Sequence, residues 1–251
     1  MLTYYVLASG SSGNATIVTN GKTTILIDLG LTLTLFRERL SETPILEENI
    51  DAILYTHSHG DHYKPFKSLP EEKIYATEGT LVLSNGNNLS FDKIYEIGEF
   101  KIQLLPTSHD AKESCGYLIS DQDESLVLLT DTGYISEDNL TLMKNATYYI
   151  IESNHDVKKL LKTDRPYDLI VRILGDEGHL SNEDSAMYMS EVLGPDSKEI
   201  TLAHLSEEAN TPELALAAYL KVFKQKRINL DQYKIQCASQ HYVVKGGHDA
   251  N

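Results

Sequence analysis

Residues 56–62 read Thr-His-Ser-His-Gly-Asp-His, so three imidazoles and a carboxylate fall within seven positions. Such side chains are costly to bury without partners, which makes packing a poor explanation of the pattern. Neutral imidazole nitrogens and carboxylate oxygens are ligands that zinc and similar divalent ions accept. This heptad therefore predicts a metal site with His57, His59, Asp61 and His62 as ligands. A polar loop that is merely rich in histidine is the less favoured alternative.

The residues before the heptad place it at the end of a strand. Residues 51–56 form a short apolar run of the strand type. We expect Gly60 to permit the sharp turn that folds the heptad's side chains around one point.

Length and composition indicate a globular chain with a substantial core. It has 251 residues, of which 41% are hydrophobic and 24% are charged. No apolar run approaches the roughly 18 residues that cross a bilayer, and no secretory signal is visible. We therefore expect a cytoplasmic protein that is not associated with a membrane. Its two cysteines, Cys115 and Cys237, are expected to be reduced thiols without a disulfide partner.

The formal net charge of −15 speaks against a broad electrostatic footprint for nucleic acid. It does not exclude a nucleic-acid enzyme, because bound cations or a local basic patch can supply positive charge where it is needed.

The order of elements predicts an α/β fold in one domain. Two strand-rich sets are each followed by helical segments, which favours two sheets face to face with helices outside. The domain would span residues 1–251, with a flexible tail from about residue 245. The expected strands cover 4–8, 15–19, 23–28, 51–56, 100–106, 116–120, 126–130, 148–152 and 233–238; the expected helices cover 31–40, 181–193 and a segment from 211.

Further candidate ligands follow other strands. His109, Asp131 and His204 each come directly after an apolar run, and strand ends commonly line a shared cleft. Each alone is as well explained as a loop or core residue, but their common placement favours ligands. Glu152 and His179 are candidates for proton transfer, the alternatives being an N-terminal helix cap at Asn154 and an ordinary helix entry at His179.

The blocks around these residues carry a family resemblance. The chain resembles the metallo-β-lactamase superfamily, and more narrowly the YycJ (also called WalJ) family of metal-dependent exonucleases. The heptad indicates the superfamily, whereas the blocks at 152–156 and 178–182 narrow it. The matching blocks are Ser9–Asn14, the heptad, Thr107–Asp110 with Gly116 and Tyr117, Thr130–Tyr134, Glu152–Asp156, Gly178–Asn182, Ala203–Ser206 and Asn210–Leu214.

The resemblance implies a four-layer αββα sandwich that holds two divalent ions, zinc or manganese, with iron possible. No room exists between Asp131 and His204 for the large insertion of the β-CASP nucleases, and an aspartate at 131 disfavours β-lactam hydrolysis. Carried over residue by residue, one ion would be held by His57, His59 and His109, a second by Asp61, His62 and His204, and Asp131 would bridge them.

The implied activity is phosphodiester hydrolysis, in which a metal-bridging hydroxide attacks the phosphate between ions about 3.5–4 Å apart. By resemblance, the chain is a 5′-to-3′ DNA exonuclease. Asp61, Glu152 and His179 would be catalytic, with His179 oriented by Glu152 to protonate the leaving 3′-oxygen.

Lys158, Lys159 and Arg172 would hold the DNA backbone, although a solvated helix face is the favoured explanation of such a run of charges. The acidic balance keeps a second hypothesis open, a metallo-hydrolase of a small-molecule phosphodiester or a lactone. A third is a metal-stabilised binding module without activity. Cys115 departs from the family pattern, because an apolar residue is expected there.

Overall fold

The structure, a computed structural model, describes residues 1–64 and 70–248. The chain divides into two units. The first comprises Met1–Pro106, Ala111–Ser125 and Ala238–Asn251, and the second comprises Thr107–Asp110 and Leu126–Cys237. The single domain over residues 1–251 stays a prediction.

The first unit contains a seven-stranded mixed sheet in the order β14-β1-β2-β3-β4-β5-β6. The three pairs from β14 to β3 are antiparallel, and the pairs from β3 to β6 are parallel. The parallel register of β3 and β4 matters for function, because the segments that follow them, residue 28 onward and residue 55 onward, emerge at one edge. The strands are β1 (Thr3–Ala8), β2 (Ala15–Thr19), β3 (Thr24–Ile27), β4 (Ala52–Leu54), β5 (Ile74–Thr77), β6 (Asn87–Leu89) and β14 (Val244–Gly247).

Helix α1 (Leu33–Leu40) begins after Thr32, whose hydroxyl accepts the backbone N–H of Leu35. It buries Phe36 and Leu40 in the core that the sheet residues build, which is the reason this short helix is stable. Two 3₁₀ turns, η1 (Glu47–Asn49) and η2 (Glu71–Lys73), lead into β4 and β5.

The first unit also holds three antiparallel strands, β7 (Ile94–Ile97), β8 (Phe100–Pro106) and β9 (Cys115–Ser120). Along β8, buried Phe100, Ile102 and Leu104 alternate with more exposed residues, as expected for a strand with one face in a core. The turn after β8 carries His109.

The second unit is built on four parallel strands, β10 (Ser125–Leu129), β11 (Tyr148–Glu152), β12 (Glu199–Ala203) and β13 (Lys234–Cys237), in sequence order. Every residue of β11 and β12 is buried, which is typical of parallel strands covered on both faces. Leu129 lies opposite Ile151, and Ile151 opposite Leu202, so the carboxyl ends of three strands reach the same edge.

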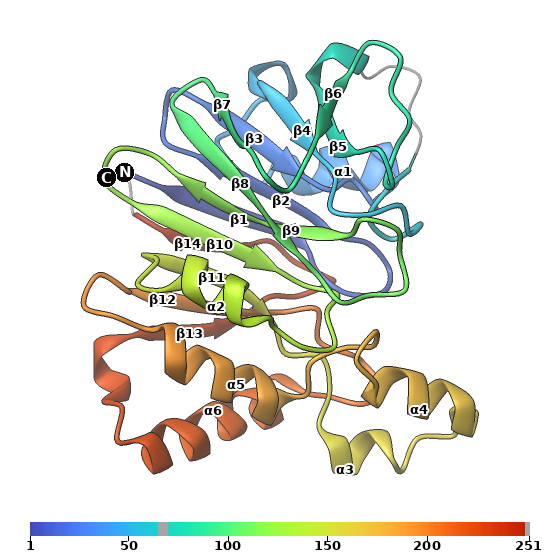
Figure 1. Cartoon of the computed structure of the whole chain (residues 1–251), viewed down its shortest axis with the longest axis vertical. Helices are drawn as coiled ribbons and strands as arrows, with labels where there is room; N and C mark the ends of the chain where they lie inside the picture. Colours follow the sequence, from blue (N-terminus) through green and yellow to red (C-terminus); the bar gives the residue numbers. More distant parts are fainter. Residues whose placement is uncertain (65–69, 249–251) are drawn as a thin grey trace. The chain divides into compact units, whose positions relative to one another are not determined.

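Helices make the connections between these parallel strands, as the geometry of parallel pairing requires. Ser181 and Thr211 cap α5 and α6 by accepting the backbone N–H three residues on. Helices α5 and α6 lie side by side (Figure 1), and Ser185 contacts the Tyr219 hydroxyl across them at 2.6 Å. The helices are α2 (Glu137–Met143), α3 (Val157–Leu160), α4 (Tyr167–Leu174), α5 (Asn182–Val192) and α6 (Pro212–Lys226), with the 3₁₀ turn η3 (Leu230–Gln232) before β13.

Most predicted elements are confirmed to within a few residues, including the two capped helices. The predicted tail is wrong up to residue 248. Residues 244–247 form β14, which pairs with β1, and the backbone N–H of His248 donates to Leu2. Residues 249–251 lie outside the described part. Within the described residues, none of the helices is both long and apolar enough to cross a bilayer.

Candidate metal centre

The imidazoles of the heptad converge in the first unit. The ring centroids of His57 and His62 lie 4.1 Å apart, and those of His57 and His59 lie 4.7 Å apart. His57 is 2% exposed and His62 is fully buried, whereas His59 and Asp61 are half-buried. The Asp61 carboxylate lies 3.7 Å from Nε2 of His62. The four predicted ligands of the heptad therefore lie together, as expected.

A buried carboxylate that sequence reasoning missed orients two of these rings. Asp28 accepts Nδ1–H of His62 at 2.8 Å and the Thr56 hydroxyl at 2.9 Å. Because the single hydroxyl hydrogen of Thr56 goes to Asp28, Nδ1–H of His57 donates to the Thr56 oxygen at 3.0 Å. Burial raises the pKa of Asp28, and the hydrogen bonds from His62 and Thr56 oppose that rise. Both rings are thus held through Nδ1, and in His57 this leaves Nε2 as the atom that could coordinate a metal ion.

The glycine- and serine-rich loop at 9–14 braces the heptad. The backbone N–H of Asn14 donates to the carbonyl of Asp61 at 2.7 Å. The Asn14 amide group donates to Nε2 of His62 at 2.9 Å and closes a reciprocal pair with Gly10.

The glycine that the turn requires is Gly30, and the expectation for Gly60 was wrong. A Cβ added at Gly60 would meet nothing within 4 Å, and Gly60 does not adopt a positive φ. A Cβ added at Gly30 would lie 1.6 Å from the carbonyl oxygen of Asp61. Only a residue without a side chain lets the segment after β3 pass this close to the heptad.

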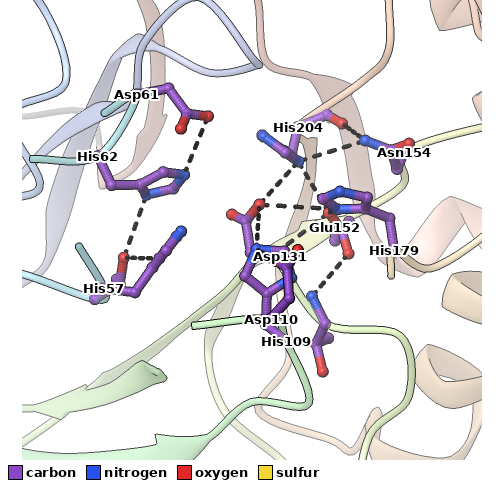
Figure 2. Close-up of polar contacts among 12 residues, drawn as sticks. His57, Asp61, His62, His109, Asp110, Asp131, Glu152, Asn154, His179 and His204 are labelled. Atoms are coloured by element: carbon purple, nitrogen blue, oxygen red, sulfur yellow. Dashed lines mark hydrogen bonds and ion pairs between the residues drawn. The ribbon is translucent and has the colours of Figure 1, made fainter. Parts of the chain in front are cut away.

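In the second unit, the carboxylate of Glu152 joins two histidines (Figure 2). It is fully buried, and Oε1 accepts Nδ1–H of His179 and of His204, each at 2.9 Å. Backbone N–H groups of Thr132 and Leu180 donate to its other oxygen at 3.1 and 3.0 Å. Burial opposes ionisation, but the facing His179 and the hydrogen bonds outweigh it and lower the pKa of Glu152 to about 2.

Asp131 lies against the same histidines. Its Oδ1 is 3.5 Å from Nδ1 of His204, 3.8 Å from Nδ1 of His179 and 3.9 Å from Nε2 of His109. Burial lowers the pKa of His109, and Asp131 partly offsets this. Asp131, Glu152, His179 and His204 each offer a ligand atom within 4.8 Å of the others. The strand-end residues His109, Asp131 and His204 are therefore brought together within this unit.

Three of the strand-end residues share an uncommon backbone conformation. Asp28, Asp131 and His204 have φ values of 59°, 56° and 55°, in the left-handed region that residues with a Cβ rarely adopt. Each of them directly follows a strand, or follows it by two residues. Such strain persists where surrounding structure over-determines it, and it concentrates at functional sites.

The two clusters suit divalent metal ions. His57, His62, His179 and His204 all turn Nδ1 to a protein oxygen, the arrangement that orients a metal-ligating imidazole through Nε2. The donors are imidazole nitrogens and carboxylate oxygens, which zinc, manganese and iron accept. The contact of His179 with Glu152 is as predicted, while its role as a proton donor stays a prediction.

The basic residues proposed to contact DNA differ in their surroundings. The Lys159 ammonium donates to the backbone carbonyl of Glu208, and Arg172 pairs with the Asp110 carboxylate. Lys158 is exposed on α3. Lys159 and Arg172 are therefore already engaged by groups of the same unit. The role of all three residues in DNA binding stays a prediction.

Both cysteines are free. Cys115 is buried, which raises the pKa of its thiol to about 12, and its backbone N–H donates to the Thr56 carbonyl at 3.0 Å. The departure from the family pattern at this position is therefore a small buried side chain beside the heptad, not a reactive group.

Comparison with known proteins identifies the family. A family model for the beta-lactamase superfamily domain matches residues 23–204. The chain is 40% identical over 227 residues to exodeoxyribonuclease WalJ of Streptococcus pneumoniae, covering 84% of both proteins. It is 33% identical over 238 residues to exodeoxyribonuclease YycJ of Bacillus anthracis, covering 90% of both.

Among solved structures, the metallo-β-lactamase fold protein YhfI of Bacillus subtilis matches with a TM-score of 0.71 at 17% identity. The match covers 98% of this chain and 99% of YhfI, and it confirms the predicted α/β fold class. The chain therefore belongs to the metallo-β-lactamase superfamily, and within it to the family of WalJ and YycJ.

Proposed function

We propose that this chain is a metal-dependent exonuclease that acts on DNA. The observation that carries the proposal is the buried carboxylate of Glu152, which orients His179 and His204 beside Asp131 at one sheet edge. Relatives that match most of the chain are named exodeoxyribonucleases, which supports DNA as the substrate. A 5′-to-3′ direction rests on the family resemblance, and a cytoplasmic location rests on the exonuclease relatives.

The ligand assignment is likewise a proposal taken from the family. In this proposal the protein binds two ions, which are zinc or manganese, with iron as a further option. Side chains of both clusters serve as ligands. One ion is assigned to His57, His59 and His109, the second to Asp61, His62 and His204, and Asp131 to both. In support, Asp28, Thr56 and Glu152 orient three of the assigned histidines, His62, His57 and His204, as metal sites require.

Bound divalent ions lower the pKa of coordinated water and offset the charge of the attacked phosphate. The residues of the chain supply the proton transfer. Glu152 accepts the Nδ1 hydrogen of His179 and fixes the ring so that Nε2 is turned away from Glu152 and free to release a proton to the leaving 3′-oxygen. The backbone N–H groups that hold Glu152 keep this pair rigid before substrate binds.

A nuclease assay tests the proposal. End-labelled duplexes are incubated with the protein and zinc, manganese or iron in turn, with Asp61→Ala as the blank. Stepwise shortening from the 5′ end by the wild type alone supports the proposal. The role of His179 is tested by His179→Ala, whose metal content is measured together with cleavage. Near wild-type cleavage at unchanged metal content would refute that role.

The proposed DNA contacts are tested by charge reversal at Lys158 and Arg172. Reversal at a residue that neutralises a phosphate weakens DNA binding, and it reduces the slope of log affinity against log salt concentration by about 1 for each such residue. Because Arg172 already pairs with Asp110, Lys158→Glu is expected to give the cleaner change. An unaltered salt slope for both variants would remove these residues from the DNA site.

The acidic balance of the chain favours a second candidate, hydrolysis of a small-molecule phosphodiester or a lactone. Turnover of a 5′-phosphorylated duplex and of a small chromogenic phosphodiester separates the two. Faster turnover of the duplex at equal enzyme concentration supports the exonuclease.

A further inference from the structure

The second unit holds four buried polar side chains that the proposed mechanism does not use. They come from three of the matching sequence blocks, at 152–156, 178–182 and 210–214. Burying hydroxyl and amide groups is costly unless they are hydrogen-bonded, so such residues are expected to form a connected network. The four residues are Ser153, Asn154, Asn182 and Asn210, and each is at most 5% exposed.

Asn154 contacts the turn that carries His204 at two points. Its side-chain amide donates to the backbone carbonyl of His204 at 2.9 Å, and its backbone carbonyl accepts the N–H of Ser206 at 2.8 Å. Figure 2 shows the Asn154 amide directed at His204. A carbonyl can only accept, so its partner fixes the orientation of this amide. Asn154 therefore holds the turn on both sides of Leu205.

The turn at His204 is one that needs support. His204 directly follows β12 with a φ of 55°, and this left-handed region is unfavourable for a residue with a Cβ. In this conformation the ring donates Nδ1–H to Glu152 at 2.9 Å. Without the hydrogen bonds of Asn154, the backbone is expected to relax towards a negative φ and to carry the ring away from Glu152.

Asn154 is itself held by Asn210. The Asn210 amide nitrogen donates to the backbone carbonyls of Ser153 and Asn154 at 2.8 and 3.0 Å. Asn182 and Asn210 also exchange two side-chain hydrogen bonds, each at 2.9 Å. Asn182 accepts the Ser153 hydroxyl at 2.7 Å as well. The network thus runs from the start of α5 and the segment before α6 to the turn at His204.

We propose that Asn154 is a positioning residue, which fixes the strained backbone of His204 so that its imidazole stays at Glu152 and is available to the metal centre. Asn210 in turn holds Asn154 in place. The proposal rests on the proposed function, because it uses the ligand role assigned to His204 there. Asn154 is not a catalytic residue in this arrangement, since it acts through the backbone of His204.

The alternative is that the network only fixes two helices, since two of its asparagines lie at the starts of α5 and α6. The two histidines at Glu152 distinguish these roles. His179 and His204 donate to the same oxygen of Glu152, but among the described residues no hydrogen bond joins Asn154 to His179. Loosening of the helices would release both rings, whereas loss of the Asn154 amide would release only that of His204.

Exchange of the two ring protons with water tests the proposal. The full-length protein is prepared with zinc and isotopically labelled histidine, and the Nδ1–H signals are assigned from His179→Ala and His204→Ala. In Asn154→Ala the exchange rate of the His204 proton is expected to rise roughly tenfold, the effect of one lost hydrogen bond, while that of the His179 proton stays within about twofold. Equal changes at the two rings, or no change at His204, would overturn the proposal.

Two further variants control for a general loss of stability. Asn145→Ala removes an amide that donates to the Asp196 carboxylate at 2.6 Å, at the amino ends of β11 and β12, the edge opposite His204. It is expected to leave the ratio of the two exchange rates at the wild-type value. Asn210→Ala leaves the Asn154 side chain intact and is expected to raise this ratio about threefold, so it provides the test if Asn154→Ala does not fold. An unchanged ratio in Asn210→Ala, or a raised one in Asn145→Ala, would overturn the proposal.

The consequence for metal binding is measured without any substrate. Competition with a chelator is expected to give a zinc affinity about tenfold lower for Asn154→Ala than for the wild type. The loss is expected to vanish in a His204→Ala background, because Asn154 acts through that ring. A loss of the same size in both backgrounds would overturn the positioning role. Failure of the proposed function is seen separately: a wild type that binds zinc but does not shorten DNA would refute the exonuclease and leave these measurements unaffected.

Discussion

The two histidine clusters are built in opposite ways. In the first unit, one heptad supplies His57, His59, Asp61 and His62, and a single carboxylate, Asp28, supports them from a neighbouring strand end. In the second unit, four separate segments each contribute about one residue around Glu152. A cluster from one loop depends on how that loop is braced, whereas a cluster from several strands depends on one shared anchor.

The largest expected effect lies in the second cluster. Asp131→Ala removes a carboxylate that lies near three histidines, and we expect it to lower kcat/KM on DNA about a thousandfold, since metal sites contribute several kcal/mol to catalysis. Chelation of the wild type would match this loss, and metal added back would rescue the wild type alone. The exposed residue Asp138 of α2 provides the control variant Asp138→Ala. Equal activity of the two variants would remove Asp131 from the site.

The dependence of the first cluster on its bracing is tested by glycine substitution. In Gly30→Ala the added Cβ must push away the carbonyl of Asp61, and we expect a loss of about 3 kcal/mol in the free energy of unfolding. Gly60→Ala, inside the heptad but facing open space, is expected to stay within about 0.5 kcal/mol of the wild type. Urea titrations compare them. If the two variants lost equal stability, the close approach at Gly30 would not be what organises the loop.

The supporting carboxylates give the most direct comparison of the clusters. Glu152→Gln weakens the hydrogen bonds that orient His179 and His204. Asp28→Asn directly weakens the hydrogen bond that orients one histidine, His62. We expect losses of about 100-fold and about tenfold in metal affinity or activity, respectively. Metal titrations and nuclease rates measure both, with circular dichroism as the check on folding. Losses of the same size would show that the shared anchor has no special importance.

The smallest expected effect concerns the neutral histidine beside the second cluster. The pKa of His155 is about 4 in the folded chain, below the roughly 6.5 of an unfolded histidine. The unfolded state therefore binds the extra proton first, and stability falls as pH drops from about 6.5 towards 4. Between pH 6.5 and 5 this group contributes a loss of about 2 kcal/mol, which His155→Gln is expected to remove. Urea titrations at both pH values measure it, and an identical pH dependence of the two proteins would contradict the prediction.

Local patterns were sufficient to predict many elements. The strand β8 (Phe100–Pro106) was predicted at its observed bounds from its apolar run, and α5 and α6 from the capping residues Ser181 and Thr211. Strand β14 was missed because Val244–Gly247 includes two glycines, which disfavour a strand locally; it forms because β1 offers an open edge. The short strand β6 (Asn87–Leu89) was missed because two of its three residues are asparagines, which are depleted in strands.

In the candidate site, too, some residues were predicted from local patterns and others were missed. Asp28 was missed although it directly follows an apolar strand, the same signal that indicated Asp131 and His204. Asn14 and Gly30 gave no signal that their role was to brace the heptad, because contacts across tens of residues leave no local pattern.

By itself, the sequence determined which chemical groups are present and where strands and capped helices begin, since periodicity, capping and ligand type are local properties. It thereby determined the superfamily and the residues able to hold metal. Only the tertiary structure decided that Glu152 serves two histidines and that Asp28 supports a third. Those relations depend on strand register and on the close approach of distant segments, which no local rule specifies.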